Sequence, residues 1–212
     1  MNPEVVKDFD VGPLLDANSP TRRFYEELAE KLLSLERVRS VVVTAVEHGV
    51  GRTSVCLGLA AALAGMGHRA AVVDCNLRRP HLHRVLGEPN FVGLTSGLET
   101  GRALENYGRE ILPGLRAVPT GPVPSDPASY LGSERLVEAV RGLEEGRRAI
   151  LLDSPVADRV LASRALSEGF DGILLVVHGV RTSKSIARET TDNLLEAGTN
   201  LLGVVLNGCA RG

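Results

Sequence analysis

The stretch from Val41 to Asp74 decides the fold, and it reads VVVTAVEHGVGRTSVCLGLAAALAGMGHRAAVVD. An apolar strand comes first, then a loop with two glycines, then an apolar helix, then a second apolar strand that ends at the carboxylate of Asp74. In such a βαβ unit the loop leaves the carboxyl end of the first strand and opens the helix. Its backbone N–H groups therefore converge on one spot, which suits an anion such as phosphate. Gly49 and Gly51 allow the backbone to approach that anion closely.

The loop follows the phosphate-binding pattern G-x-x-x-x-G-K-[ST] only in part. Gly51 and Thr53 fit the second glycine and the hydroxyl position, whereas Val46 stands at the first glycine and Arg52 at the lysine. We expect Thr53 to ligate Mg²⁺, as the hydroxyl of a P-loop does. The alternative, a tight turn that feeds a packed helix, stays open on the loop alone. The predicted nucleotide-binding residues here are Gly49, Val50, Gly51, Arg52, Thr53 and Ser54.

Composition limits the possible classes of protein. The chain has 212 residues, 43% of them hydrophobic but only 3% aromatic, so one core of aliphatic side chains is expected. A net charge of -2 gives no reason to expect nucleic-acid or membrane-surface binding. No apolar run approaches the roughly 20 residues that a membrane span needs. Residues 1–16 are polar and acidic, so we expect a cytoplasmic protein without a signal peptide.

Apolar segments and amphipathic segments alternate along the chain. Residues 1–19 show no periodicity, and we expect an extended or partly disordered arm there, followed by a single P-loop NTPase-like domain over residues 20–212. This alternation indicates the α/β class, with a mostly parallel sheet and helices on both faces. Strands are expected at 41–44, 70–73, 115–119, 149–153, 172–177 and 201–206, and the longer helices at 20–35, 51–66, 133–143 and 182–197.

Polar residues follow several of these strands directly. Asp74, Asp153 and Asn207 each end an apolar strand, and Asn76 follows two residues after the first of them. Ligands of parallel sheets bind at the carboxyl ends of the strands, so we expect these side chains, with Thr44, to share one cleft with the loop. Phosphoryl transfer needs cations on the phosphates and carboxylates that place Mg²⁺. We therefore predict Asp74, Asp153 and Arg52 as catalytic residues, Asn207 as nucleotide-binding, and Thr53, Asp74 and Asp153 as Mg²⁺ ligands. Either carboxylate alone would instead cap nearby N–H groups.

Residues 74–80, DCNLRRP, resemble the Walker A′ motif D-x-D-L-R-R-P of the bacterial tyrosine kinases, or BY-kinases. Residues 153–155, DSP, are similar to the end of their Walker B strand, D-T-P. Segments 121–127, 171–177 and 203–207 also look like parts of this family. The resemblance covers roughly residues 21–208, and the A′ run is its most specific part.

The resemblance implies the fold of MinD/ParA-type P-loop ATPases, with ATP or ADP and Mg²⁺ as ligands wherever binding is retained. It implies a role in capsule or exopolysaccharide synthesis. The implied partner is the cytoplasmic segment of a membrane polysaccharide co-polymerase, also called a chain-length regulator. The chain would then be cytoplasmic, or peripheral at the inner face of the membrane through that partner, without direct membrane insertion.

The departures from the family pattern fall on the chemistry. Arg52 replaces the lysine of the loop and Asn76 the second aspartate of the A′ motif, while Glu47 brings a negative charge near the phosphates. We expect Arg52 to point outward or to fill part of the phosphate space, because arginine is longer and more rigid than lysine.

Two further departures concern assembly and substrate. The family's E-x-x-R-x-x-R run, used for ring assembly, aligns with Arg23, Glu26 and Ala29, so a closed octameric ring is not expected. The tyrosines, Tyr25, Tyr107 and Tyr130, are isolated and form no cluster.

These departures leave more than one function open. The first is a catalytically degenerate family member that regulates a membrane chain-length regulator. The second is an active ATP-dependent tyrosine autokinase or ATPase that tolerates Arg52 and Asn76. A third is a MinD/ParA-like ATPase with another cargo, although Glu47 occupies the position where that class carries a second lysine.

Overall fold

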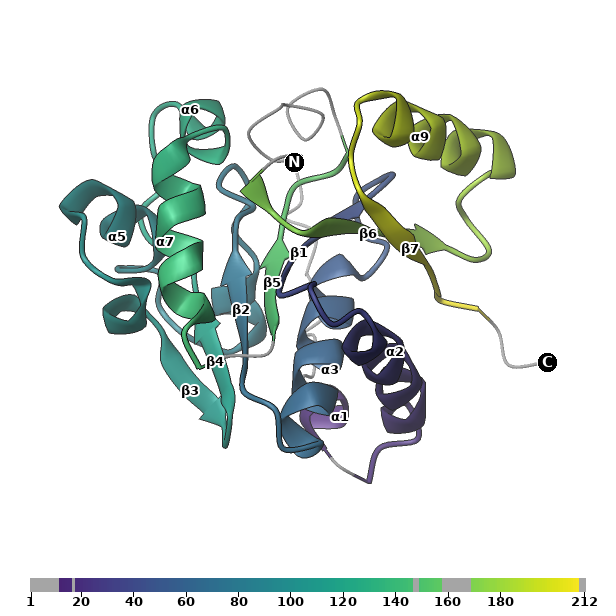
Figure 1. Ribbon diagram of the computed structural model, residues 1–212, viewed down its shortest axis with the longest axis horizontal. Coiled ribbons are helices and arrows are strands. Elements are labelled where there is room, and N and C mark those ends of the chain that lie inside the picture. The colour runs from purple at the N-terminus through teal and green to yellow at the C-terminus, as the bar shows by residue number, and fades with distance from the viewer. Residues whose placement is uncertain (1–11, 17, 147–148, 158–168, 210–212) are drawn as a thin grey trace, which may run out of the picture.

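One seven-stranded sheet forms the centre of the protein in a computed structural model that describes residues 12–16, 18–146, 149–157 and 169–209. The spatial order is β3-β4-β2-β5-β1-β6-β7 (Figure 1). All neighbouring strands run parallel except β3 and β4, which pair antiparallel. The α/β class with a mostly parallel sheet is thus confirmed. The strands are β1 (Ser40–Ala45), β2 (Ala70–Asp74), β3 (Arg109–Leu112), β4 (Leu115–Val118), β5 (Ala149–Asp153), β6 (Gly172–His178) and β7 (Leu201–Asn207).

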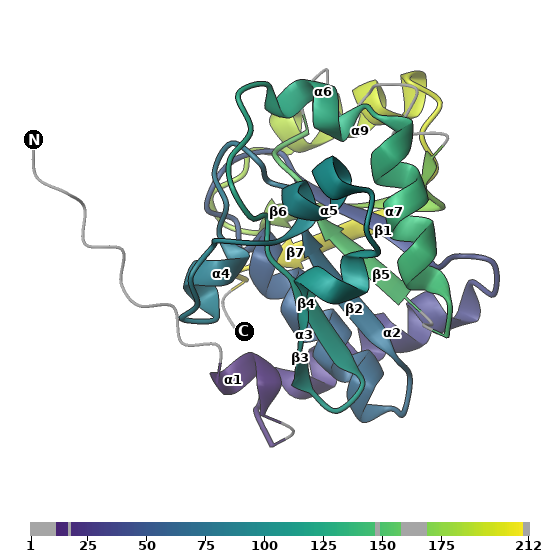
Figure 2. The ribbon, with the colours of Figure 1, turned by 90° about the vertical axis from the view of Figure 1, so that its left-hand side faces the viewer.

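Helices cover both faces of this sheet. Figure 1 shows α2 and α3 on one side and α5 and α7 on the other, and in Figure 2 the latter two lie toward the viewer. Among the described residues, no helix is both long and apolar enough to cross a bilayer. The helices are α1 (Gly12–Leu15), α2 (Arg22–Ser34), α3 (Arg52–Gly65), α4 (Leu82–Val85), α5 (Leu94–Thr100), the 3₁₀ helix η1 (Leu104–Tyr107), α6 (Pro127–Leu131), α7 (Glu134–Glu144) and α9 (Lys184–Glu196).

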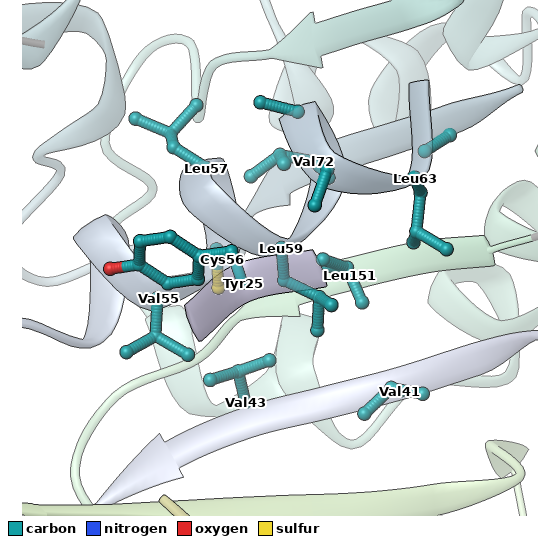
Figure 3. Packing of buried hydrophobic residues seen from close by; sticks show 14 of the residues in the cluster. Tyr25, Val41, Val43, Val55, Cys56, Leu57, Leu59, Leu63, Val72 and Leu151 are labelled. Carbon is teal, nitrogen blue, oxygen red and sulfur yellow. The ribbon is translucent and has the colours of Figure 1, made fainter. Parts of the chain in front are cut away.

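The central helix α3 is packed between α2 and the sheet. From Val55 onward its side chains are accordingly apolar on every side. The ring of Tyr25 from α2 lies against Gly58 of α3, where a Cβ atom would collide with it. Figure 3 shows this ring beside Val55 and Cys56, above the side chains of β1. Burial raises the pKa of Tyr25 to about 12. A glycine at this helix position therefore permits the close helix–helix contact that holds α3 and the preceding loop in place.

Two local features differ from what the sequence indicates. The edge strand β3 was not expected, since its residues Arg109 and Glu110 are charged and exposed and give no apolar run. Within the arm expected at residues 1–19, Gly12–Leu15 forms a short helix instead of an extended segment, and Leu14 is buried. Residues 1–11 lie outside the described residues, and the division into arm and domain stays a prediction.

Candidate nucleotide-binding cleft

The loop between β1 and α3 has the backbone of a phosphate cradle. Gly49 and Gly51 have positive φ angles of 74° and 84°, which only glycine adopts without strain. The Asn207 side chain at the end of β7 donates a hydrogen bond of 2.7 Å to the Val50 carbonyl. A Cβ atom on Gly51 would collide with that same amide. The end of β7 thus fixes the loop, while the nucleotide-binding role expected for Asn207 stays a prediction.

The backbone N–H groups of residues 48–54 donate no hydrogen bond to any described residue. These residues line a cleft of about 780 Å³ at the carboxyl edge of the sheet. Unsatisfied donors at the start of a 14-residue helix form a ready-made anion site. The loop is therefore suited to a phosphate group.

The floor of the cleft is an internally bonded group of three side chains. The Arg52 Nε donates to Oδ1 of Asp153 over 2.6 Å, and the Thr53 hydroxyl donates to Oδ2 over 2.5 Å. Arg52 and Thr53 are 9% and 8% exposed, and Asp153 is fully buried. Arg52 therefore does not point outward, because its guanidinium is bonded to Asp153 at the end of β5. The other expected placement, in part of the phosphate space, stays a prediction.

Asp74 lies beside Asp153, its direct partner in the pairing of β2 with β5. Its carboxylate accepts hydrogen bonds from the backbone N–H groups of Asn76, His81 and Leu82, all between 2.9 and 3.0 Å. Burial raises the pKa of Asp74 from its ordinary 3.8 to about 7, and the Asp153 charge adds to the rise. The three N–H donors oppose it. Asp74 thus organises the turn toward α4, which is the capping role that the sequence left as its alternative.

The rim of the cleft is cationic. Arg78, Arg79 and Arg84 line it together with His48 and His81, and Glu47 is the one acid among its lining residues. The three arginines form no ion pair with any described residue. Burial lowers the pKa of His81, which favours its neutral form. Positive charge at the rim is therefore carried mainly by arginine side chains that remain available to a ligand.

A second loop, residues 179–183 between β6 and α9, is hydrogen-bonded to the loop between β1 and α3. The Arg181 guanidinium donates to the Gly49 carbonyl over 2.6 Å, and the Thr182 hydroxyl donates to Glu47 over 2.6 Å. Sequence reasoning missed both residues, and it also missed Arg84. The available signal was their position after the carboxyl end of a buried strand, where parallel sheets bind ligands.

The predicted site residues are thus brought together with one exception. The loop residues Gly49 to Ser54 line the cleft with Asn76, while Asp153, Asp74 and Asn207 lie around it through the contacts described above. Thr44 is fully buried and its hydroxyl donates to the Pro155 carbonyl, so it does not line the cleft. The catalytic and ligand roles that we assign to these residues remain predictions.

The polar groups of the cleft fit one of the two implied ligands, the nucleotide, better than the other, Mg²⁺. The free loop N–H groups and the arginine rim fit the phosphates of ATP or ADP. The predicted Mg²⁺ ligands Thr53 and Asp153 do not form an open metal site in this arrangement. One carboxylate oxygen of Asp153 accepts a hydrogen bond from Arg52 and the other accepts one from the Thr53 hydroxyl. No group of three or more His, Cys, Asp or Glu side chains that could hold a metal occurs among the described residues.

Residues 38–195 match the family described as "Cellulose biosynthesis protein BcsQ". The chain belongs to this family. Among its curated relatives is the putative tyrosine-protein kinase EpsB of Ralstonia solanacearum, 32% identical over 79% of the chain and 22% of EpsB. The tyrosine-protein kinase YwqD of Bacillus subtilis (strain 168) is 28% identical over 81% of the chain and 73% of YwqD. The chain thus spans only about a fifth of the length of the first relative.

Solved structures agree with this placement. The VpsO kinase domain has a TM-score of 0.79 and 26% identity, over 90% of the chain and 95% of that domain. The septum site-determining protein MinD of Pyrococcus horikoshii OT3, complexed with Mg-ADP, has a TM-score of 0.64 and 23% identity, over 80% and 70% of the two chains. These comparisons therefore confirm the resemblance to bacterial tyrosine kinases and the MinD-like P-loop fold.

Proposed function

We propose that this chain is a catalytically degenerate, BY-kinase-like P-loop protein, in effect a pseudokinase. It regulates a membrane chain-length regulator in exopolysaccharide or capsule synthesis, as the family resemblance implies. The observation that carries the proposal is the ion pair between Arg52 and Asp153 at the floor of the cleft. In an active P-loop site the loop cation meets the β- and γ-phosphates and the carboxylate helps to place Mg²⁺. Here the two groups neutralise one another.

The A′ motif supports the same proposal. Asn76 stands where the family carries an aspartate, and an amide brings no charge to a metal. Asp74 keeps its carboxylate, but backbone N–H groups occupy both of its oxygens. Glu47 adds a negative charge to the lining of the cleft. Each change weakens the electrostatic stabilisation on which phosphoryl transfer depends.

Helix α2 supports a partner other than a ring of identical subunits. Arg23 and Glu26 form ion pairs within the helix, with Glu27 and Arg22 respectively. Ala29, at the third position of the ring motif, is fully buried against the core. The charges that such a ring would use are therefore engaged or missing, and we propose that the chain does not close into an octamer.

An active tyrosine autokinase or ATPase is the second candidate. It is favoured by the open cleft of about 780 Å³ and by the free N–H groups of the loop. Relatives at 28 to 32% identity carry the name tyrosine-protein kinase. On this reading Arg52 leaves Asp153 when nucleotide enters and replaces the family's lysine.

Incubation with γ-labelled ATP and Mg²⁺ separates the two candidates. We expect no label on the wild-type chain, alone or with the cytoplasmic segment of a chain-length regulator, while that segment still binds the chain in a co-purification assay. Label on tyrosine in the wild type would replace the proposal with the kinase candidate. Absence of both label and partner binding would remove the regulatory role.

A further inference from the structure

We infer that this cleft takes a di- or triphosphate ligand that carries no magnesium, held by the backbone N–H groups of the loop, by the guanidinium N–H donors of Arg52 that Asp153 does not use, and by the arginines of the rim. The inference rests on the proposed function, because it concerns the ligand of the same cleft. It goes further by naming the chemical form of that ligand, which is a phosphate-bearing anion without bound metal, such as ADP that is not complexed with Mg²⁺.

The carboxylate and the hydroxyl that would hold the metal at the floor of the cleft already have partners. Asp153 is fully buried and uses one carboxylate oxygen on Arg52 and the other on Thr53. Mg²⁺ at Thr53 would lie next to a guanidinium group that is itself paired with the same carboxylate. Breaking a buried ion pair to admit another cation is strongly unfavourable.

The described part of the cleft also has too few free carboxylates to attract a dication. Both carboxylate oxygens of Asp74 accept hydrogen bonds from backbone N–H groups of the turn that follows β2. Asn76 is neutral, and Mg²⁺ in P-loop sites is bound through one or two carboxylates plus substrate phosphates.

Hydrogen-bond donors for a phosphate without bound metal are plentiful in the cleft. The N–H groups of residues 48–54 donate to no described residue. Arg52 lines the cleft, and among the described residues it donates only from Nε, to Asp153, which leaves its remaining guanidinium N–H groups available. Arg78, Arg79 and Arg84 add three unpaired cations at the rim. Arginine recognises phosphate through paired N–H donors without a metal.

The competing account is that Arg52 releases Asp153 when nucleotide binds, after which Mg²⁺ enters in the usual manner. The two accounts differ in one measurable quantity, the ratio of ADP affinity in Mg²⁺ to ADP affinity in EDTA. Magnesium-dependent sites bind the complex, so the ratio is large. A site built for the bare anion shows equal or weaker affinity in Mg²⁺, because the metal competes for the ligand.

The experiment is an equilibrium titration with ADP in Mg²⁺ and in EDTA. For the wild type we expect weak binding that is equal in both buffers or weaker in Mg²⁺. Arg52→Lys should make ADP binding at least about tenfold tighter in Mg²⁺ than in EDTA, since lysine is a compact point charge that can leave Asp153 for the phosphates. Arg141→Lys, the same change on an exposed part of α7, should behave as the wild type.

Wild-type affinity at least about tenfold tighter in Mg²⁺ would overturn the inference. Failure to bind ADP in both buffers would overturn it equally, since the inference asserts a ligand. Neither result decides the proposed regulatory function, which is tested by the absence of phosphotransfer and by partner binding. Conversely, tyrosine labelling by the wild type would remove that function and leave the magnesium ratio measurable.

Discussion

The floor and the rim of the cleft use the same residue type in opposite ways. At the floor, Arg52 is buried and bonded to Asp153, so its charge is satisfied inside the protein. At the rim, Arg78, Arg79 and Arg84 form no ion pair with any described residue. Burial decides the difference, because a buried cation needs a permanent counter-ion and a solvated one does not. An arginine at the lysine position of a P-loop can therefore become part of the structure instead of part of the chemistry.

The largest expected effect comes from removing the floor's counter-ion. Asp153→Ala leaves the Arg52 guanidinium and the Thr53 hydroxyl buried without a partner. We expect a loss of about 3–5 kcal/mol in the free energy of unfolding, measured by urea denaturation. Asp192→Ala, an exposed change on α9, is the matched control and should cost less than about 0.5 kcal/mol.

A second variant keeps this test independent of folding failure. Arg52→Met with Asp153→Leu removes both charges together, and it should recover much of the stability lost in Asp153→Ala. A loss below about 1 kcal/mol in Asp153→Ala would contradict the description of the floor as a structural ion pair.

The next effect concerns Asp74, behind the floor. Its folded-state pKa of about 7 lies above the ordinary 3.8, so the folded protein holds a proton that the unfolded chain has lost between those values. The stability that Asp74 contributes relative to Asp74→Asn should therefore fall as pH rises from about 4 to about 7, by a few kcal/mol. His81 has a lowered pKa and acts in the opposite direction, but it is common to both proteins.

Urea denaturation of the wild type and Asp74→Asn across this pH range measures the difference. A difference that stays constant with pH would show that Asp74 titrates near its ordinary pKa, because its three N–H donors offset the effect of its burial.

A smaller effect tests how rigidly the loop between floor and rim is held. Gly49→Ala meets only the strain of a positive φ, since the nearest atom to its Cβ is 4.0 Å away. Gly51→Ala adds a collision with the Asn207 amide. We expect a cost of about 1 kcal/mol for the first variant and about 1–2 kcal/mol more for the second.

Asn207→Ala in the Gly51→Ala background should recover part of the additional loss in the free energy of unfolding, because the amide that collides with the Cβ atom is removed. Equal costs for the two glycine variants would show that Asn207 moves aside freely and does not fix the loop.

The smallest effect on stability is expected at the rim. Arg78→Gln, Arg79→Gln and Arg84→Gln should each change the free energy of unfolding by less than about 0.5 kcal/mol. Each should nevertheless weaken ADP binding several-fold and reduce its dependence on salt, because one exposed cation near a phosphate is lost. Arg102→Gln, exposed beyond the end of α5, is the control. Unchanged ADP affinity in all three variants would mean that the rim takes no part in binding.

The sequence was informative where burial dictates residue type. Strands such as β1 and β5 are covered on both faces, so their continuous apolar runs could be recognised. The gathering of Asp74, Asp153 and Asn207 at one edge of the sheet could also be predicted, because the carboxyl ends of parallel strands meet there. The edge strand β3 is charged and short, and its pairing with β4 depends on tertiary context that no local pattern reveals.

The direction of the Arg52 side chain could not be read in the same way. Its partner Asp153 lies 101 residues away, and only the pairing of β1 with β5 brings that carboxylate under the loop. The hold of Arg181 and Thr182 on the loop likewise joins positions more than 130 residues apart. Contacts of this kind depend on the assembled fold instead of local spacing.

We propose that Arg52 and Asn76 remove metal-dependent nucleotide chemistry from this P-loop cleft. The most direct measurement is a calorimetric titration of the wild type and of Arg52→Lys/Asn76→Asp with ATP and Mg²⁺. We expect feeble or no binding by the wild type and a gain of at least tenfold, about 1.4 kcal/mol, in the double variant. Micromolar binding by the wild type with no gain in the variant would contradict the account and make the active kinase the leading interpretation.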